Sequence, residues 1–182
     1  MFYADDLQIF ASASIDSLPS TVSRLEKCIS AIRSWLASSM LTLNEAKTEC
    51  LVTGTPPMLK KCTVSHVLIS NHNVPFSSSV RNLGVTLDSS LNLKAHIATV
   101  CAKSFGRLRL VSRLKKIISS SHYSMLVNAL VLSGLDYCSS IYLGLPQTST
   151  SKLQDVLNGA FRSANGLRKF DRIGEAYRHR GW

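Results

Sequence analysis

Hydrophobic and polar positions near the start of the chain predict a short strand followed by a long helix. Residues 7–11 alternate between apolar and polar, which is the pattern of a half-buried strand. Asp16 to Pro19 then supply small polar caps and a proline suited to a first helical turn. Apolar residues follow at steps of three and four and form one stripe: Val22, Leu25, Ile29, Ile32 and Leu36. We expect Cys28 and Trp35 on this helix to pack into a core.

The next segment changes to strand-like patterns. Residues 49–53 and 80–87 each predict a strand. Residues 64–69 and 74–76 predict the two arms of a hairpin. The first half of the chain is therefore expected to mix strands with one helix.

The second half is predicted to be helical. Residues 92–118 place apolar side chains at helical spacing, with basic residues mostly on the opposite face. Gly106 is expected to bend or split this helix. Residues 122–137 are apolar nearly all round and predict a buried helix, and 151–161 predict a shorter one. His96 and His122 are expected to be helix caps or solvated residues.

Length and composition place the chain among globular proteins. It has 182 residues, of which 45% are hydrophobic, with only 9 Gly and 5 Pro, which excludes disordered and collagen-like classes. No apolar run is long enough for a membrane span, so no membrane partner is expected. Five cysteines without a close Cys-x-x-Cys pair, and a start without a basic or apolar leader, predict an intracellular protein that is not secreted.

The positive charge is confined to the second half of the chain. Residues 1–90 hold seven basic and seven acidic side chains, so the formal net charge of +10 belongs to the remainder. Seven basic residues and no acidic one lie between Lys94 and Lys116. Such asymmetry favours contact with a polyanion, most commonly nucleic acid. The alternative is a basic surface without a ligand.

An acidic doublet near the start suggests metal chemistry. Asp5 and Asp6 precede the first predicted strand, and two adjacent carboxylates can converge on one spot only at a turn between strands. Their mutual repulsion is relieved by a divalent cation, and hard carboxylate oxygens suit Mg²⁺. A metal site of this kind can support phosphoryl transfer. The alternative is an exposed Asp-Asp turn without a metal.

Four segments resemble LINE-type (non-LTR retrotransposon) reverse transcriptases, in order and in spacing. The sequence Tyr-Ala-Asp-Asp at 3–6 resembles the signature box, residues 41–49 the palm motif that follows, and residues 80–88 the primer-grip hairpin. Residues 91–154 resemble the thumb. The resemblance implies an α+β fold, in which a partial polymerase palm of β-hairpin, helix and strands precedes an all-helical thumb. The expected domains are palm over 1–90, thumb over 91–162 and a divergent, poorly ordered tail over 163–182.

The same resemblance assigns roles to individual residues. Asp5 and Asp6 would be catalytic and bind Mg²⁺ in a two-metal site, and Lys47 would protonate the pyrophosphate leaving group. Leu83 and Gly84 would form the primer grip. The RNA template and DNA primer, as an RNA–DNA hybrid, would be held by Tyr3 and by the thumb cations Lys103, Arg107, Arg109, Arg113, Lys115 and Lys116.

The resemblance also implies parts that the sequence does not contain. The family places a further metal-binding aspartate and a fingers region ahead of the box, and only Met1 and Phe2 precede it here. We therefore expect a fragment that does not polymerise alone, since positioning and charge neutralisation supply most of this catalysis. The alternatives are a non-enzymatic basic helical module that binds nucleic acid, and a retroelement relic without activity.

Overall fold

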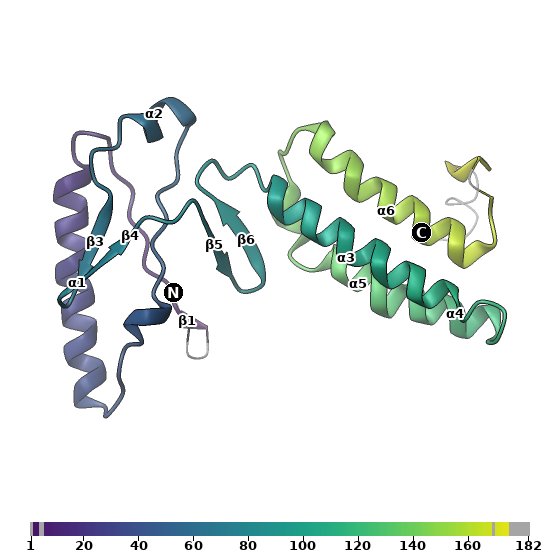
Figure 1. The fold of residues 1–182 in the computed structure, drawn as a ribbon, viewed down its shortest axis with the longest axis horizontal. Coiled ribbons are helices and arrows are strands. Elements are labelled where there is room, and N and C mark those ends of the chain that lie inside the picture. The colour runs from purple at the N-terminus through teal and green to yellow at the C-terminus, as the bar shows by residue number, and fades with distance from the viewer. Residues whose placement is uncertain (1, 4–5, 169, 175–182) are drawn as a thin grey trace. The chain divides into compact units, whose positions relative to one another are not determined.

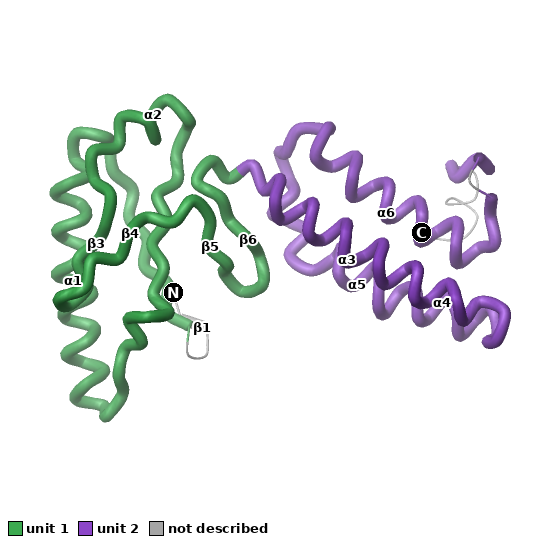
Figure 2. Tube along the Cα trace, in the orientation of Figure 1, with its two compact units in different colours: residues 1–91 green, residues 92–182 purple. Residues whose placement is uncertain are grey.

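The chain divides into two compact units, residues 1–91 and 92–182 (Figure 2). A computed structural model of the protein describes residues 2–3, 6–168 and 170–174. Each unit has its own buried residues and is described by itself. Unit 1 mixes helices with strands, and the described elements of unit 2 are all helical (Figure 1). The expected α+β class is confirmed at this level.

The long helix of unit 1 begins and ends near the predicted positions. Helix α1 spans Leu18–Ser38 and carries Pro19 in its first turn. It ends where Met40 adopts a left-handed conformation (φ 57°) and Leu41 N–H donates to the Leu36 carbonyl at 2.9 Å. This arrangement is a Schellman-type termination, here without the usual glycine.

The strands of unit 1 form three separate antiparallel pairs. They are β1 (Phe2–Tyr3) with β2 (Asp6–Leu7), β3 (His66–Ile69) with β4 (His72–Pro75), and β5 (Ser79–Asn82) with β6 (Val85–Asp88). Two short helices, η1 (Glu45–Lys47) and α2 (Pro56–Lys60), lie between α1 and β3 in the sequence. The predicted hairpin at 64–76 is confirmed, and the strand predicted over 80–87 is two strands joined by a turn.

The buried centre of unit 1 lies between α1 and the β3–β4 hairpin. Val22 of α1 packs with Val67 and Ile69 of β3, and all three are nearly inaccessible. A two-stranded hairpin covers only part of a 21-residue helix. The expectation that Trp35 and Cys28 pack in the core is therefore wrong: Trp35 is 58% exposed and Cys28 is also exposed.

Two predicted strands are shorter than expected or absent. The strand expected over 7–11 ends at Leu7, where the pairing with β1 ends. The strand expected over 49–53 is reduced to one parallel bridge between Cys50 and Phe76. An apolar and polar pattern typical of a strand does not produce one when no neighbouring strand continues beside it.

Unit 2 is built around α3 (Lys94–Ser112) and α6 (Gln147–Asn165), which lie side by side. Ile97 and Val111 of α3 and Val156 and Phe161 of α6 are buried. Helix α3 runs through Gly106 without interruption, contrary to the expected bend or split. The packed residues that precede and follow Gly106 in the helix offset the cost of about 1 kcal/mol that a glycine brings to a helix interior. The helix ends at Ser112, and residues 113–117 form turns, so the expected helix over 92–118 is shorter.

The helix predicted over 122–137 is present as three successive segments. They are α4 (Ser120–Val127), the π-helical η2 (Asn128–Leu132) and α5 (Ser133–Asp136), and the short η3 (Ser139–Tyr142) follows. Tyr123, Val127 and Val131 are fully buried at steps of four residues, a spacing between the α and π periods. The expectation of all-round burial is wrong, since Met125 and Leu130 are exposed. Across the described residues, none of the helices has the length and apolar character that a membrane crossing requires.

Candidate functional site

Asp6, the second residue of the acidic doublet, lies in a strand that pairs with the first strand of the chain. β1 and β2 pair antiparallel, with Phe2 opposite Leu7 and Tyr3 opposite Asp6. The expectation places Asp6 in a turn between two strands, whereas Asp6 is the first residue of β2. The Asp6 side chain is exposed and accepts no hydrogen bond among the described residues. Asp5 lies outside the described residues, as does the Tyr3 side chain.

The segment predicted as a primer grip forms a tight hairpin. β5 and β6 pair from Ser79 opposite Asp88 to Asn82 opposite Val85, so only Leu83 and Gly84 connect them. Both residues are left-handed, with φ of 44° and 84°. Two left-handed central residues are typical of a type I′ turn, which matches the twist of the flanking strands. Gly84 adopts this conformation without steric cost, whereas the side chain of Leu83 makes the same conformation unfavourable.

A side-chain hydrogen bond joins these two hairpins. Gln8 directly follows β2, and its Nε2 donates to Oδ1 of Asn82, the last residue of β5, at 2.6 Å. The two residues are 74 positions apart in the sequence. The strand that contains Asp6 and the Leu83–Gly84 turn are therefore brought to one region of unit 1, which sequence spacing could not establish.

Lys47 ends a 3-10 turn that also contains Glu45, whose carboxylate is half-buried. Asn44 caps η1 by accepting the Lys47 backbone N–H at 3.2 Å, and the Lys47 side chain is exposed. Its neighbour Glu45 accepts from Ser70 Oγ at 2.6 Å and lies 3.7 Å from Arg33 and 3.5 Å from His72. Glu45 thus ties η1 to α1 and to the β3–β4 hairpin. Within the described part of the chain, no bond links the Lys47 ammonium to Asp6.

The cations predicted to bind nucleic acid fall into two groups. Arg107 Nη1 donates to the Leu130 carbonyl in η2 at 3.1 Å. Lys115 Nζ donates to the Ser163 carbonyl at 2.7 Å and lies 5.6 Å from the centre of the Tyr123 ring. These two side chains bond to other elements of unit 2, Arg107 to η2 and Lys115 to α6. The other four are exposed and make no ion pair among the described residues: Lys103, Arg109, Arg113 and Lys116.

A buried histidine is a feature that the sequence analysis missed. His96 is 5% exposed, and its Nε2 shares a hydrogen bond with the Tyr142 hydroxyl at 3.3 Å, with the two rings stacked at 6.1 Å. Burial, and then the charge of Lys103, lower the pKa of His96. Burial raises the pKa of Tyr142 and that of Cys101. The expectation that His96 is a cap or solvated is wrong, because α6 and η3 enclose the start of α3. His122 is exposed and bonded to Ser119 Oγ at 2.7 Å.

The described residues contain no cluster of three or more histidine, cysteine, aspartate or glutamate side chains able to hold a metal ion. Of the predicted Mg²⁺ ligands, only Asp6 lies among the described residues. Comparison of the chain with protein-family models, with curated proteins and with solved structures finds no match.

Proposed function

We propose that this chain is the palm and thumb part of a LINE-type reverse transcriptase, an RNA-directed DNA polymerase of a retrotransposon. The observation that carries the proposal is the Gln8–Asn82 hydrogen bond, which links the strand that contains Asp6 to the Leu83–Gly84 hairpin. A polymerase needs both at one place, because the primer end has to lie beside the metal ligands. The order and spacing of the sequence motifs supply independent support.

In the proposed reaction, a primer 3′ hydroxyl attacks the α-phosphate of a deoxynucleoside triphosphate and releases pyrophosphate. Asp5 and Asp6 would hold Mg²⁺, which when bound neutralises phosphate charge and orients the reacting oxygens. The exposed Asp6 carboxylate is open to a cation from solvent. Lys47 would donate a proton to the departing pyrophosphate. The Leu83–Gly84 turn would contact the primer backbone closely, since Gly84 carries no side chain.

Lys103, Arg109, Arg113 and Lys116, which are exposed, would contact the sugar–phosphate backbone of an RNA–DNA hybrid. Helix α3 carries no acidic residue, so no carboxylate on the same helix competes with phosphate. Phosphate contacts position a duplex and do not read its sequence. This part of the proposal implies binding that is independent of sequence and steeply dependent on salt.

Photo-crosslinking tests the assignment of the first unit. The purified chain is bound to an RNA template annealed to a DNA primer that carries a photoreactive nucleotide at its 3′ end. Crosslinks are expected in peptides that contain residues 2–8 or 79–88. The same photoreactive group placed at the distant primer 5′ end serves as the control and is expected to spare both peptides.

The second candidate function is a non-enzymatic basic helical module that binds nucleic acid. The self-contained core and exposed cations of unit 2 favour it. This candidate predicts crosslinks confined to residues 92–165, wherever the photoreactive group lies, and that result would overturn the palm assignment. Absence of any hybrid binding at low salt would overturn both candidates and indicate a relic.

A further inference from the structure

Strand β3 has an edge that no other strand covers among the described residues. Phe76 N–H donates to the Ser65 carbonyl at 3.0 Å, and Val67 lies opposite Val74. Hydrogen-bonded pairs alternate along an antiparallel ladder, so the backbone groups of residues 66 and 68 point away from β4. Pro75, which has no N–H to donate, stands opposite residue 66 and agrees with this register.

One backbone N–H on this edge already has a hydrogen-bond partner, which is a carboxylate of α1. Glu26 Oε1 accepts the Leu68 N–H at 2.8 Å across 42 residues of sequence. The Leu68 carbonyl and the His66 N–H and carbonyl make no hydrogen bond in the described part of the protein. An edge strand with free backbone groups is a template for another extended chain, and a charged side chain is a common means of limiting it.

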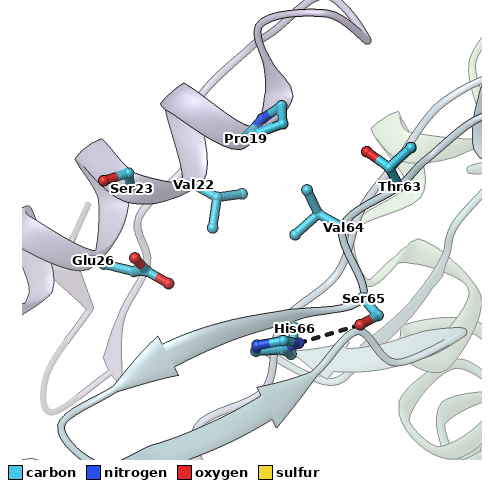
Figure 3. A pocket seen from close by; sticks show the side chains of 8 residues that line it. All are labelled: Pro19, Val22, Ser23, Glu26, Thr63, Val64, Ser65 and His66. Carbon is cyan, nitrogen blue, oxygen red and sulfur yellow. Dashed lines mark hydrogen bonds between the residues drawn. The ribbon is translucent and has the colours of Figure 1, made fainter.

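A groove of about 320 Å³ opens between α1 and the segment that enters β3. Val22 and Val64 point toward one another across it, with Pro19 beside them, and Glu26 projects toward the strand (Figure 3). Apart from His66, Glu26 is the only ionisable residue in the lining. The groove therefore combines an apolar wall, an open strand edge and one negative charge.

We propose that this groove binds an extended peptide that adds to the β3 edge as a third strand. Its backbone pairs with His66 and Leu68, an apolar side chain packs on Pro19 and Val64 in the groove, and a lysine or arginine side chain pairs with Glu26. A peptide carbonyl replaces Glu26 at the Leu68 N–H, and the released carboxylate takes the cation. Backbone hydrogen bonds supply affinity in this mode and side-chain pockets supply specificity. The single acidic charge disfavours nucleic acid at this site.

The test uses two eight-residue peptides of alternating valine and threonine, one with a central lysine and the other with a central glutamate. Calorimetric titration against the full chain is expected to give about tenfold tighter binding of the lysine peptide, equivalent to about 1.4 kcal/mol. Glu26→Lys is expected to reverse this preference. Glu49→Lys changes an exposed acid of the same unit and is the matched control, expected to keep it.

A second measurement does not depend on any variant. Amide hydrogen exchange in the wild-type chain is expected to slow at His66 when the lysine peptide is bound. A lysine peptide N-methylated at alternate amides is expected not to bind, since it cannot complete the ladder. Equal affinities of the two charged peptides, no binding of either, or unchanged exchange at His66 would each overturn the proposal.

Discussion

The side chains of Gln8 and Asn82 are joined by a 2.6 Å hydrogen bond that spans 74 residues of sequence. Each partner lies at one of the two hairpins of the candidate site. Gln8 follows β2, which contains Asp6, and Asn82 precedes the Leu83–Gly84 turn. Because each hairpin has only two strands, neither can align itself with the other through a continuous sheet. Their relative position therefore depends on contacts between side chains such as this one.

Removing either partner of this bond is expected to destabilise unit 1 and to weaken its proposed binding of a primer end. A net contribution of about 1 kcal/mol is typical for such a bond. We expect Gln8→Ala and Asn82→Ala each to lower the free energy of unfolding of unit 1 by about that amount, measured by hydrogen exchange. The double variant should cost less than the sum of the two, because the shared bond is lost only once. Strict additivity would contradict a direct bond.

The same substitution at two glycines is expected to have opposite effects. Gly84 has a φ of +84°, where an alanine side chain is strained, so Gly84→Ala should destabilise unit 1 by about 1–2 kcal/mol. Gly106 lies within α3, and a Cβ built there meets nothing within 4 Å. Gly106→Ala should stabilise unit 2 by about 1 kcal/mol through higher helix propensity. Urea denaturation of the two variants measures both signs. Stabilisation by Gly84→Ala would contradict the turn conformation.

Much of the fold follows from local sequence signals. The boundaries of α1 can be predicted because Pro19 marks its first turn and a stripe of apolar residues marks the face that turns inward. The β3–β4 hairpin is readable from its two apolar runs. The segment at 49–53 is not, because a strand also needs a neighbouring edge, and only Cys50 finds one. Trp35 is exposed for a related reason, since the hydrophobic core of unit 1 contacts α1 at Leu18, Val22 and Ile29 and does not reach Trp35.

The candidate site was less predictable than the fold. Sequence motifs indicated Asp6 and the Leu83–Gly84 turn, but no local signal pairs Gln8 with Asn82. Charge patterning treated all six predicted nucleic-acid-binding cations alike, and the structure separates Arg107 and Lys115, which bond to backbone carbonyls, from the four without such a bond. That distinction arises only when helices pack, because the π segment η2 places the Leu130 carbonyl where Arg107 can reach it.

The two groups of cations are expected to respond differently to removal. Lys103→Ala and Arg109→Ala should leave the stability of unit 2 nearly unchanged and weaken binding of an RNA–DNA hybrid. Each should reduce the slope of log affinity against log salt by about one, since one phosphate contact is lost. Arg107→Ala and Lys115→Ala should instead destabilise unit 2, by about 0.5–1.5 kcal/mol each, because a hydrogen bond at an exposed site is lost. Fluorescence anisotropy measures binding and thermal unfolding measures stability. Equal behaviour of all four variants would contradict the division.

The buried His96 is expected to make unit 2 less stable in mild acid. Burial and the nearby Lys103 hold the pKa of His96 below its ordinary value of about 6.5, so the folded unit keeps a neutral imidazole beside Tyr142. The unfolded chain takes up a proton at higher pH than the folded one. The contribution of His96 to stability is therefore complete above about pH 6.5 and is lost as the pH falls through that value. The melting temperature of unit 2 should accordingly fall between pH 7.5 and pH 5.5. His96→Phe keeps a stacked ring that cannot titrate and should flatten this dependence, whereas His122→Gln, at the exposed histidine of α4, should preserve it. An unchanged slope in His96→Phe would assign the acid sensitivity to another group.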